Sequence, residues 1–385
     1  MNIRSHILHC FVCLLLLSAL YSCRTDEVVL PPEEEKKGDV IKSEVVGFYL
    51  LNEGNMGSNK ATLDYYDFSK AVYTRNIYSA ANPEVPQSLG DVGNELKIYG
   101  SRLYAVINCS NLIEVMDATT AKHIGTINIP NCRYLAFKDG YGYIFSCYAG
   151  PVVVDASKAQ IGYVAKFDTA TLNIVDTCYV GFQPDELEIV DNMLYVANSG
   201  GYMKPNYENT LSVIDLTSFK ELRRIPIAIN LHRVRMDKYN YIWVSSRGNY
   251  EQIPSRLYCV DTKKNKVVDS VKIAVDNMWL DGDSLYVYSE SFNTITMTND
   301  ISYHIVNTKT RKVIATKWFD DSSITIEKPY GVFVHPVTKD IFLADAKNFV
   351  EPGTLWCIGQ DGKAKWSVRT GDIPGHFALL YKTTQ

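Results

Sequence analysis

The segment from Pro184 to Ile227 reads PDELEIVDNMLYVANSGGYMKPNYENTLSVIDLTSFKELRRIPI. It holds four short runs rich in β-branched, aromatic and leucine residues, separated by residues that favour turns, chiefly Asn, Asp, Gly and Pro. Its apolar residues do not follow the period of a helix over any useful length. The segment therefore predicts four short antiparallel strands joined by turns.

This four-strand unit recurs along the chain. Its second run, LYVAN, returns as FYLLN at Phe48, LYAVIN at Leu103 and IWVSS at Ile242, and its third run usually ends in an acidic turn residue. The turn residues are Asp67, Asp117, Asp168, Asp215, Asp261, Asn307 and Gly359, spaced 46 to 52 residues apart. An Asp or Asn side chain in a turn accepts hydrogen bonds from nearby backbone N–H groups, so we expect a structural role here. Seven such units without helices predict an all-β fold, a seven-bladed β-propeller with four antiparallel strands per blade.

The two ends of the repeat pattern indicate how the ring closes. The first unit begins at Phe48 with a second strand, so its innermost strand is missing from the N-terminal side. The chain ends with GHFALLYK (Gly375 to Lys382), which follows Ile373-Pro374 as DELEIV follows Gln183-Pro184. We therefore expect the C-terminal strand to join the N-terminal blade, which removes exposed sheet edges.

The N-terminal segment has the character of a secretory leader. Residues 11–20, FVCLLLLSAL, are apolar but too few to span a bilayer, which needs about 20 such residues. The next residues, LYSC, end at Cys23 and resemble a bacterial lipobox. An ordinary signal peptide with an incidental Cys is the alternative. We predict a lipoprotein signal peptide at 1–22, a lipidated Cys23 with a flexible acidic tether at 23–43, and the propeller at 44–385.

Charge and cysteine content narrow the class of partner. The net charge of −4 does not favour nucleic acid. The six cysteines beyond the leader show no CxxC and no metal spacing. We expect Cys259 and Cys357 to be buried free thiols, and a disulfide between Cys109 and either Cys132 or Cys147 stays open. We expect no cofactor and no metal from ligand spacing, with calcium on loop oxygens left open.

One face of the propeller is expected to bind a ligand. The loops between the second and third strands are long and uneven and rich in Asn and aromatic residues, whereas the opposite turns are short. In the first of these loops, we expect Asn52 and Gly54 to hold the turn and Asn55 and Met56 to reach the rim. By position, the candidate ligand-binding residues are Asn55, Asn108, Arg133, Tyr134, Tyr148, Glu186, Asn198, Tyr202, His232, Arg247, Tyr250, Phe292, Tyr330, Phe349 and His376. Turn or packing duty is the alternative for each.

The chemistry of these residues favours a broad, partly apolar ligand fringed with amides or hydroxyl groups, because Asn both donates and accepts and Tyr offers a flat face with a polar tip. No Arg/Lys cluster or Gly-rich loop points to phosphate. The chain also lacks the G-x-S-x-G and H-E-x-x-H motifs, so we expect no enzyme. The alternative is a lyase-like enzyme with His232 and His376 as acid and base beside Asp185 or Glu186, similar in position to the His of streptogramin lyases.

The lipobox, the stretch YLLNEGNMGSNKATLDYYD and the LYVANSG…LSVIDLTS repeats together resemble Bacteroidetes surface lipoproteins with YncE-like seven-bladed propellers. The best-understood members are the surface cobalamin-binding (BtuG-type) lipoproteins, which pass vitamin B12 to a TonB-dependent outer-membrane transporter. The resemblance implies an outer-membrane lipoprotein, anchored through Cys23 and facing the cell exterior, that captures cobalamin or a related corrinoid. A protein- or glycan-recognition propeller is the alternative.

Overall fold

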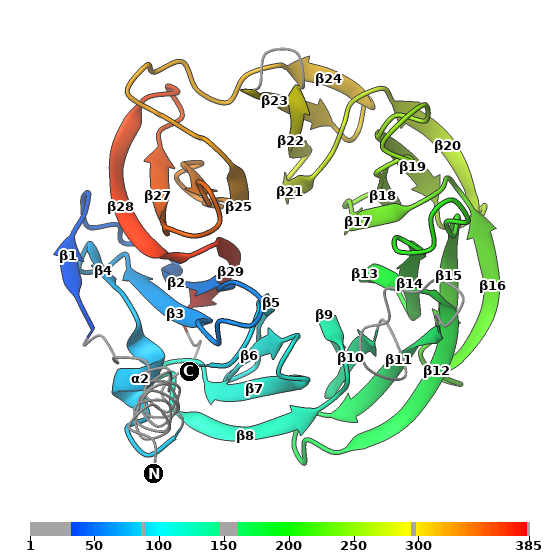
Figure 1. The fold of residues 1–385 in the computed structure, drawn as a ribbon, viewed down its shortest axis with the longest axis horizontal. Helices are drawn as coiled ribbons and strands as arrows, with labels where there is room; N and C mark the ends of the chain where they lie inside the picture. Colours follow the sequence, from blue (N-terminus) through cyan, green and yellow to red (C-terminus); the bar gives the residue numbers. More distant parts are fainter. Residues whose placement is uncertain (1–31, 86–88, 147–159, 294–297, 383–385) are drawn as a thin grey trace, which may run out of the picture. The chain divides into compact units, whose positions relative to one another are not determined.

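The computed structural model describes residues 32–382, except for 86–88, 147–159 and 294–297 (Figure 1). The predicted signal peptide, Cys23, Tyr148 and Cys147 therefore lie outside the described residues. In the part of the chain that the structure describes, no helix has the length and apolar character needed to cross a membrane.

Seven antiparallel sheets stand in a ring and form the blades of a seven-bladed β-propeller (Figure 1). From the channel outward, blade 1 comprises β29 (Pro374–Tyr381), β2 (Val45–Asn52), β3 (Thr62–Asp67) and β4 (Val72–Thr74). Blade 2 comprises β5 (Gly93–Tyr99), β6 (Arg102–Ile107), β7 (Leu112–Asp117) and β8 (His123–Asn128). Blade 3 comprises β9 (Cys132–Lys138), β10 (Tyr141–Ser146), β11 (Ile161–Asp168) and β12 (Ile174–Phe182). Blades 4 and 5 comprise β13 (Pro184–Val190), β14 (Met193–Asn198), β15 (Thr210–Asp215) and β16 (Lys220–Pro226); and β17 (Leu231–Met236), β18 (Tyr241–Ser246), β19 (Arg256–Asp261) and β20 (Lys266–Val271). Blades 6 and 7 comprise β21 (Asn277–Asp281), β22 (Ser284–Asn293), β23 (Thr298–Asn307) and β24 (Lys312–Ala315); and β25 (Pro329–Val334), β26 (Ile341–Asp345), β27 (Pro352–Ile358) and β28 (Ala364–Asp372). The short helix α2 (Ile77–Ala81) lies between blades 1 and 2 in the chain.

The ring closes as the sequence predicts. The C-terminal strand β29 is the innermost strand of blade 1 and pairs with β2, with Tyr49 opposite Ala378 and Leu51 opposite His376. Because β29 comes from one end of the chain and β2 from the other, this pairing builds blade 1 from both ends of the chain and closes the ring between blades 7 and 2.

Blade 1 carries a fifth strand that the sequence does not predict. β1 (Glu34–Lys36) pairs with β4 on the outside of the blade, and the hydroxyl group of Tyr66 donates a hydrogen bond to the Lys37 carbonyl. β1 falls within the segment 23–43 that we assigned to a flexible tether, so the end of that segment belongs to the sheet. β4 has only three residues and leaves an edge that can accept another strand.

The blades pack through apolar side chains, and the predicted turn residues cap the hairpins. Phe333 and Phe342 stack with ring centroids 4.4 Å apart in the core between blades 7 and 1. In blade 2, Asp117 accepts hydrogen bonds from the Thr119 and Thr120 backbone amides at 3.0 and 2.9 Å. The same Asp contact recurs in blades 1, 3, 4 and 5, which confirms the structural role of these acids.

The cysteines follow the prediction in part. Cys259 and Cys357 are buried free thiols, as expected. Cys109 is a free thiol, so it does not form with Cys132 the disulfide that the sequence left open. The other possible partner, Cys147, lies outside the described residues.

Candidate functional site

The loops between the second and third strands gather exposed apolar side chains. Because neighbouring strands in a blade run in opposite directions, all seven of these loops leave from the same face. Five large apolar side chains on them are 50% to 77% exposed, and we call them the loop rim: Met56, Tyr202, Tyr250, Ile253 and Val350. Exposed apolar groups gathered on one face favour contact with another molecule.

Below the loop rim, two arginines share one carboxylate at the mouth of the central channel. Arg133 of β9 and Arg247, directly after β18, approach the two Asp185 oxygens at 3.2 and 2.7 Å. Burial alone would raise the pKa of Asp185, but Arg133 and Arg247 more than offset this and hold it below its ordinary value. The cluster carries two positive charges for one negative charge, and the arginine side chains stay 27% and 25% exposed. The sequence shows no arginine cluster, because Arg133, Asp185 and Arg247 come from three different blades.

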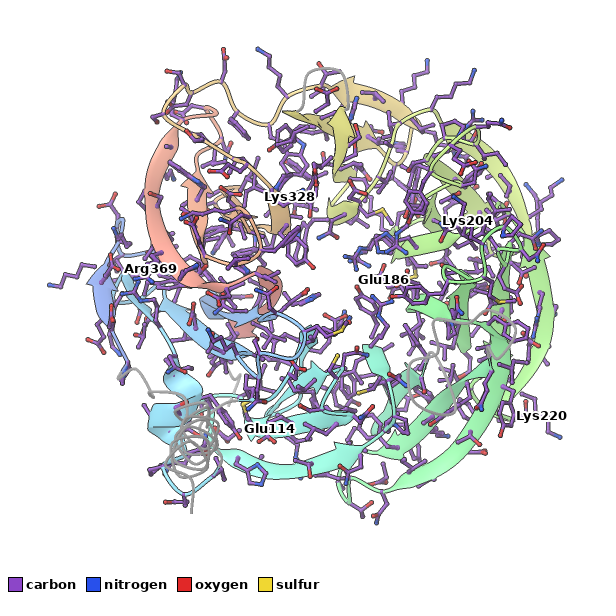
Figure 2. All side chains as sticks on the ribbon, viewed as in Figure 1. Glu114, Glu186, Lys204, Lys220, Lys328 and Arg369 are labelled. Atoms are coloured by element: carbon purple, nitrogen blue, oxygen red, sulfur yellow. The ribbon has the colours of Figure 1, made fainter. Side chains whose placement is uncertain are left out.

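A second polar layer lies one residue deeper along the innermost strands. Glu186 of β13 forms an ion pair with Arg235 at 2.7 Å and also accepts a hydrogen bond from the Val234 amide. Burial would raise the pKa of Glu186, and Arg235 and Arg233 lower it instead. Arg233 donates to the Tyr134 hydroxyl group. Figure 2 shows Glu186 at the inner edge of the ring. Tyr134 and Glu186 are thus engaged inside the channel rather than at the loop rim.

The structure adds Glu53, which was absent from the candidate residues. The Tyr330 hydroxyl group donates to one Glu53 oxygen at 2.9 Å, and Nε2 of His376 lies 2.9 Å from the other. Glu53 follows β2 directly, as Arg247 follows β18, and each precedes a glycine with positive φ, Gly54 and Gly248. An alignment of the repeats at this position would have found Glu53, because the side chains of Glu53 and Arg247 both turn from the end of a second strand toward the channel mouth.

The three candidate asparagines hold the scaffold together. Asn198 is fully buried, accepts from the Gly181 amide at 2.9 Å and donates to Ser212 at 2.8 Å. Asn108 donates to the Cys132 carbonyl at 2.9 Å, which ties blade 2 to blade 3. Asn55 donates to the Phe349 carbonyl and so joins the loops of blades 1 and 7. As predicted for the same loop, Asn52 is buried and bonded to Asp64, and Gly54 has a φ of 72°.

The two candidate histidines have different carboxylate neighbours. His232 is 5% exposed beside Asp185, and its Nδ1 has no hydrogen-bond partner among the described residues. Burial, followed by Arg247 and Arg233, lowers the pKa of His232 well below its ordinary value, so the ring is neutral. His376 instead contacts Glu53. Within the described residues, no group of three or more His, Cys, Asp or Glu side chains is arranged to hold a metal ion.

The candidate residues therefore fall into separate zones. Tyr202 and Tyr250 lie on the loop rim, 59% and 68% exposed, and Phe349 is half-buried with its ring 5.8 Å from that of Tyr330. Lys328, labelled in Figure 2, lies 5.2 Å from the Phe349 ring and forms an ion pair with Glu290. The channel mouth and channel hold Arg133, Tyr134, Glu186, His232, Arg247, Tyr330 and His376. Tyr148 and the Phe292 side chain lie outside the described residues.

These features define a propeller with a loop-rich face set around a charged channel mouth. The chain belongs to the DUF5074 family, described as a domain of unknown function, whose model matches residues 46–352. No curated protein matches the sequence.

Solved structures share the fold at low identity. A Kuenenia stuttgartiensis hydrazine synthase chain is 15% identical with a TM-score of 0.58, and the match covers 76% of this chain and 96% of that one. A quinonprotein alcohol dehydrogenase-like protein from Bacteroides thetaiotaomicron is 14% identical with a TM-score of 0.55, covering 87% of this chain and 78% of that one. At these identities the likeness concerns the fold alone.

Proposed function

We propose that this chain is a ligand-capturing propeller whose loop-rich face takes a large, amphipathic small molecule, namely cobalamin or a related corrinoid. We further propose that a lipid on Cys23 anchors the protein to the outer membrane, facing the cell exterior, and that the ligand passes to a TonB-dependent transporter. The resemblance of the N-terminal and repeat motifs to surface cobalamin-binding lipoproteins supports this assignment.

The observation that carries the proposal is the loop rim around the Arg133–Asp185–Arg247 cluster. A corrinoid presents a broad apolar plate with amide groups at its edge, so it needs both aromatic faces and polar groups placed around them. Tyr202 and Tyr250 offer exposed aromatic faces, and the partly exposed Arg133 and Arg247 offer polar groups. A closed ring holds these loops on a rigid base, which lowers the ordering cost of binding.

The direct test is calorimetric titration of the purified protein with cyanocobalamin. Saturable binding is expected, with a change in the absorbance of the corrinoid. The absence of heat and of a spectral change at micromolar ligand would overturn the proposal, and binding to glycans instead would favour the recognition alternative.

Substitutions on the loop rim locate the binding face. We expect Tyr202→Ala and Tyr250→Ala each to weaken cyanocobalamin binding about tenfold, equivalent to about 1.4 kcal/mol, because exposed tyrosines often anchor interfaces. Tyr179→Ala is the matched control, because Tyr179 is similarly exposed, at 61%, but lies on the outer strand β12. Wild-type affinity in the Tyr202→Ala, Tyr250→Ala double variant would show that the ligand binds elsewhere.

A further inference from the structure

The half of the central channel that faces the short turns contains a cavity of about 610 Å³. The seven innermost strands that surround the channel in Figure 1, β5, β9, β13, β17, β21, β25 and β29, all contribute to its lining. Tyr134, Glu186, Arg233 and His376 line its deep end. Asp185 and His232, which precede Glu186 and Arg233 on their strands toward the loop-rich face, are almost fully buried and do not belong to the lining. The cavity is therefore a site distinct from the loop rim.

The wall of this cavity has two chemically different halves. Lys97 of β5, Glu188 of β13 and Arg235 of β17 bring charges to one half. Trp279 of β21 and Phe377 of β29 give the other half an aromatic surface. Both aromatic rings pack against buried Phe333, with centroid distances of 6.0 and 4.8 Å, so this surface is held in place. A fixed aromatic wall facing charged groups suits a molecule with an apolar end and a charged end.

Glu188 is the charged group that the protein itself leaves without an ionic partner. Arg235 is paired with Glu186 at 2.7 Å, and Lys97 lies 3.7 Å from Glu95. Among the described residues Glu188 forms no such ion pair, and its carboxylate accepts a hydrogen bond from the adjacent Ile189 amide at 3.3 Å. Burial raises the pKa of Glu188, while the positive charges of Lys97 and Arg235 oppose that rise. An acid of this kind gains most from a cationic group that enters the cavity.

The charges of the lining balance, so the cavity does not select for a net cation or a net anion. Its ionisable acids are Glu95, Glu186 and Glu188, and its permanent cations are Lys97, Arg233 and Arg235. Lys97 keeps 47% of its side chain exposed, and Tyr381 is exposed at the same end, which gives solutes access from the short-turn face. A molecule that carries both charges on a small head would satisfy both signs at once.

We propose that this cavity is a second small-molecule site and that it takes a free α-amino acid with an aromatic or large aliphatic side chain. The ammonium group of the ligand is placed at Glu188, its carboxylate at Lys97 and Arg235, and its side chain against Trp279 and Phe377. The volume lies within the range of about 300–1,000 Å³ that is usual for small-molecule pockets.

The test titrates the purified protein with L-phenylalanine, with binding followed by ligand-observed NMR and calorimetry. Phenethylamine carries the same ring with a cation only, and 3-phenylpropionate carries it with an anion only. We expect saturable binding of L-phenylalanine at millimolar concentration or below, and binding of each single-charge analogue about tenfold weaker or more, since each loses a charge-assisted contact. A lack of saturable L-phenylalanine binding, or equal binding of phenethylamine, would overturn the proposal.

Two variants place the ligand in the cavity. Glu188→Gln keeps the size of the side chain and is expected to weaken L-phenylalanine binding about tenfold. Lys97→Gln is the second variant. Because about half of the Lys97 side chain is exposed, this variant tests the site even if Glu188→Gln fails to fold, and it should weaken the binding of L-phenylalanine more than that of phenethylamine. Glu34→Gln, on the outer strand β1, is the matched control. Unchanged binding in Glu188→Gln and Lys97→Gln would contradict the assignment. Because cyanocobalamin binding is measured separately, either proposal can fail without the other.

Discussion

At the scale of single residues, the channel mouth depends on charges that blades contribute one at a time. Arg133, Asp185 and Arg247 come from blades 3, 4 and 5, so the sequence shows each of them alone. The position of each residue at a strand start or directly after a strand predicts that it faces the channel, and the structure places all three there. Their pairing could not be predicted, because it depends on how far each side chain reaches across the ring.

His232 gives this layer a measurable pH dependence. Its pKa is lowered in the folded protein by burial and by Arg247 and Arg233, whereas the unfolded chain protonates near its ordinary value, about 6.5. Below that value the unfolded state binds a proton that the folded state does not, so stability falls as the pH drops and is regained as the pH rises.

We therefore expect the wild type to lose about 1.4 kcal/mol more unfolding free energy than His232→Gln between about pH 7.5 and 5.5. Urea unfolding at both pH values measures the difference. His123→Gln is the control, because its side chain is 35% exposed on β8 rather than buried in the channel. Parallel losses in the wild type and in His232→Gln would contradict the neutral, buried histidine.

At the scale of elements, the sequence predicts the four strands that recur in every blade, but it does not predict β1, which has no counterpart in the other blades. The four strands of each blade carry apolar runs bounded by turn residues, and Asp117 and its equivalents mark the hairpins. β1 has the sequence Glu34-Glu35-Lys36, which has no strand character by composition. It becomes a strand because β4 offers an open edge, and this is a tertiary cause that local sequence does not encode.

The pairing of β1 can be broken at one hydrogen bond. The Lys37 amide donates to the Ala71 carbonyl at 2.8 Å, so Lys37→Pro removes a donor at the end of the strand. We expect faster hydrogen exchange in β4 and a loss of about 1 kcal/mol in unfolding free energy, with the ring intact. Lys36→Pro is the control, because amide direction alternates along a strand and the Lys36 amide points away from β4. Equal exchange in β4 for Lys37→Pro and the wild type would show that β1 is not a stable part of the sheet.

At the scale of the whole molecule, both the channel mouth and the channel cavity depend on ring closure. The repeat pattern predicts seven blades and the closing strand, because a missing first strand at one end of the chain matches an extra one at the other. β29 supplies His376 to the Glu53 contact and Phe377 to the aromatic wall of the cavity. Closure therefore completes both candidate sites as well as the fold.

Removal of the closing strand is the strictest test of this architecture. A chain that ends at Asp372 lacks β29, which leaves β2 with an open edge and exposes the apolar side chains that β29 covers, including Leu50 opposite Phe377. Since β29 is the innermost strand of blade 1 and pairs with β2 along the channel, we expect this chain to lose cooperative unfolding and to aggregate. A chain that ends at Lys382 is the control and should unfold as the wild type does. Co-expression of the segment from Ile373 to Lys382 with the truncated chain should restore a soluble, cooperatively folded protein, because the pairing with β2 depends on contacts rather than on chain continuity. A truncated chain with the wild-type unfolding midpoint would mean that the ring is held together without its closing strand.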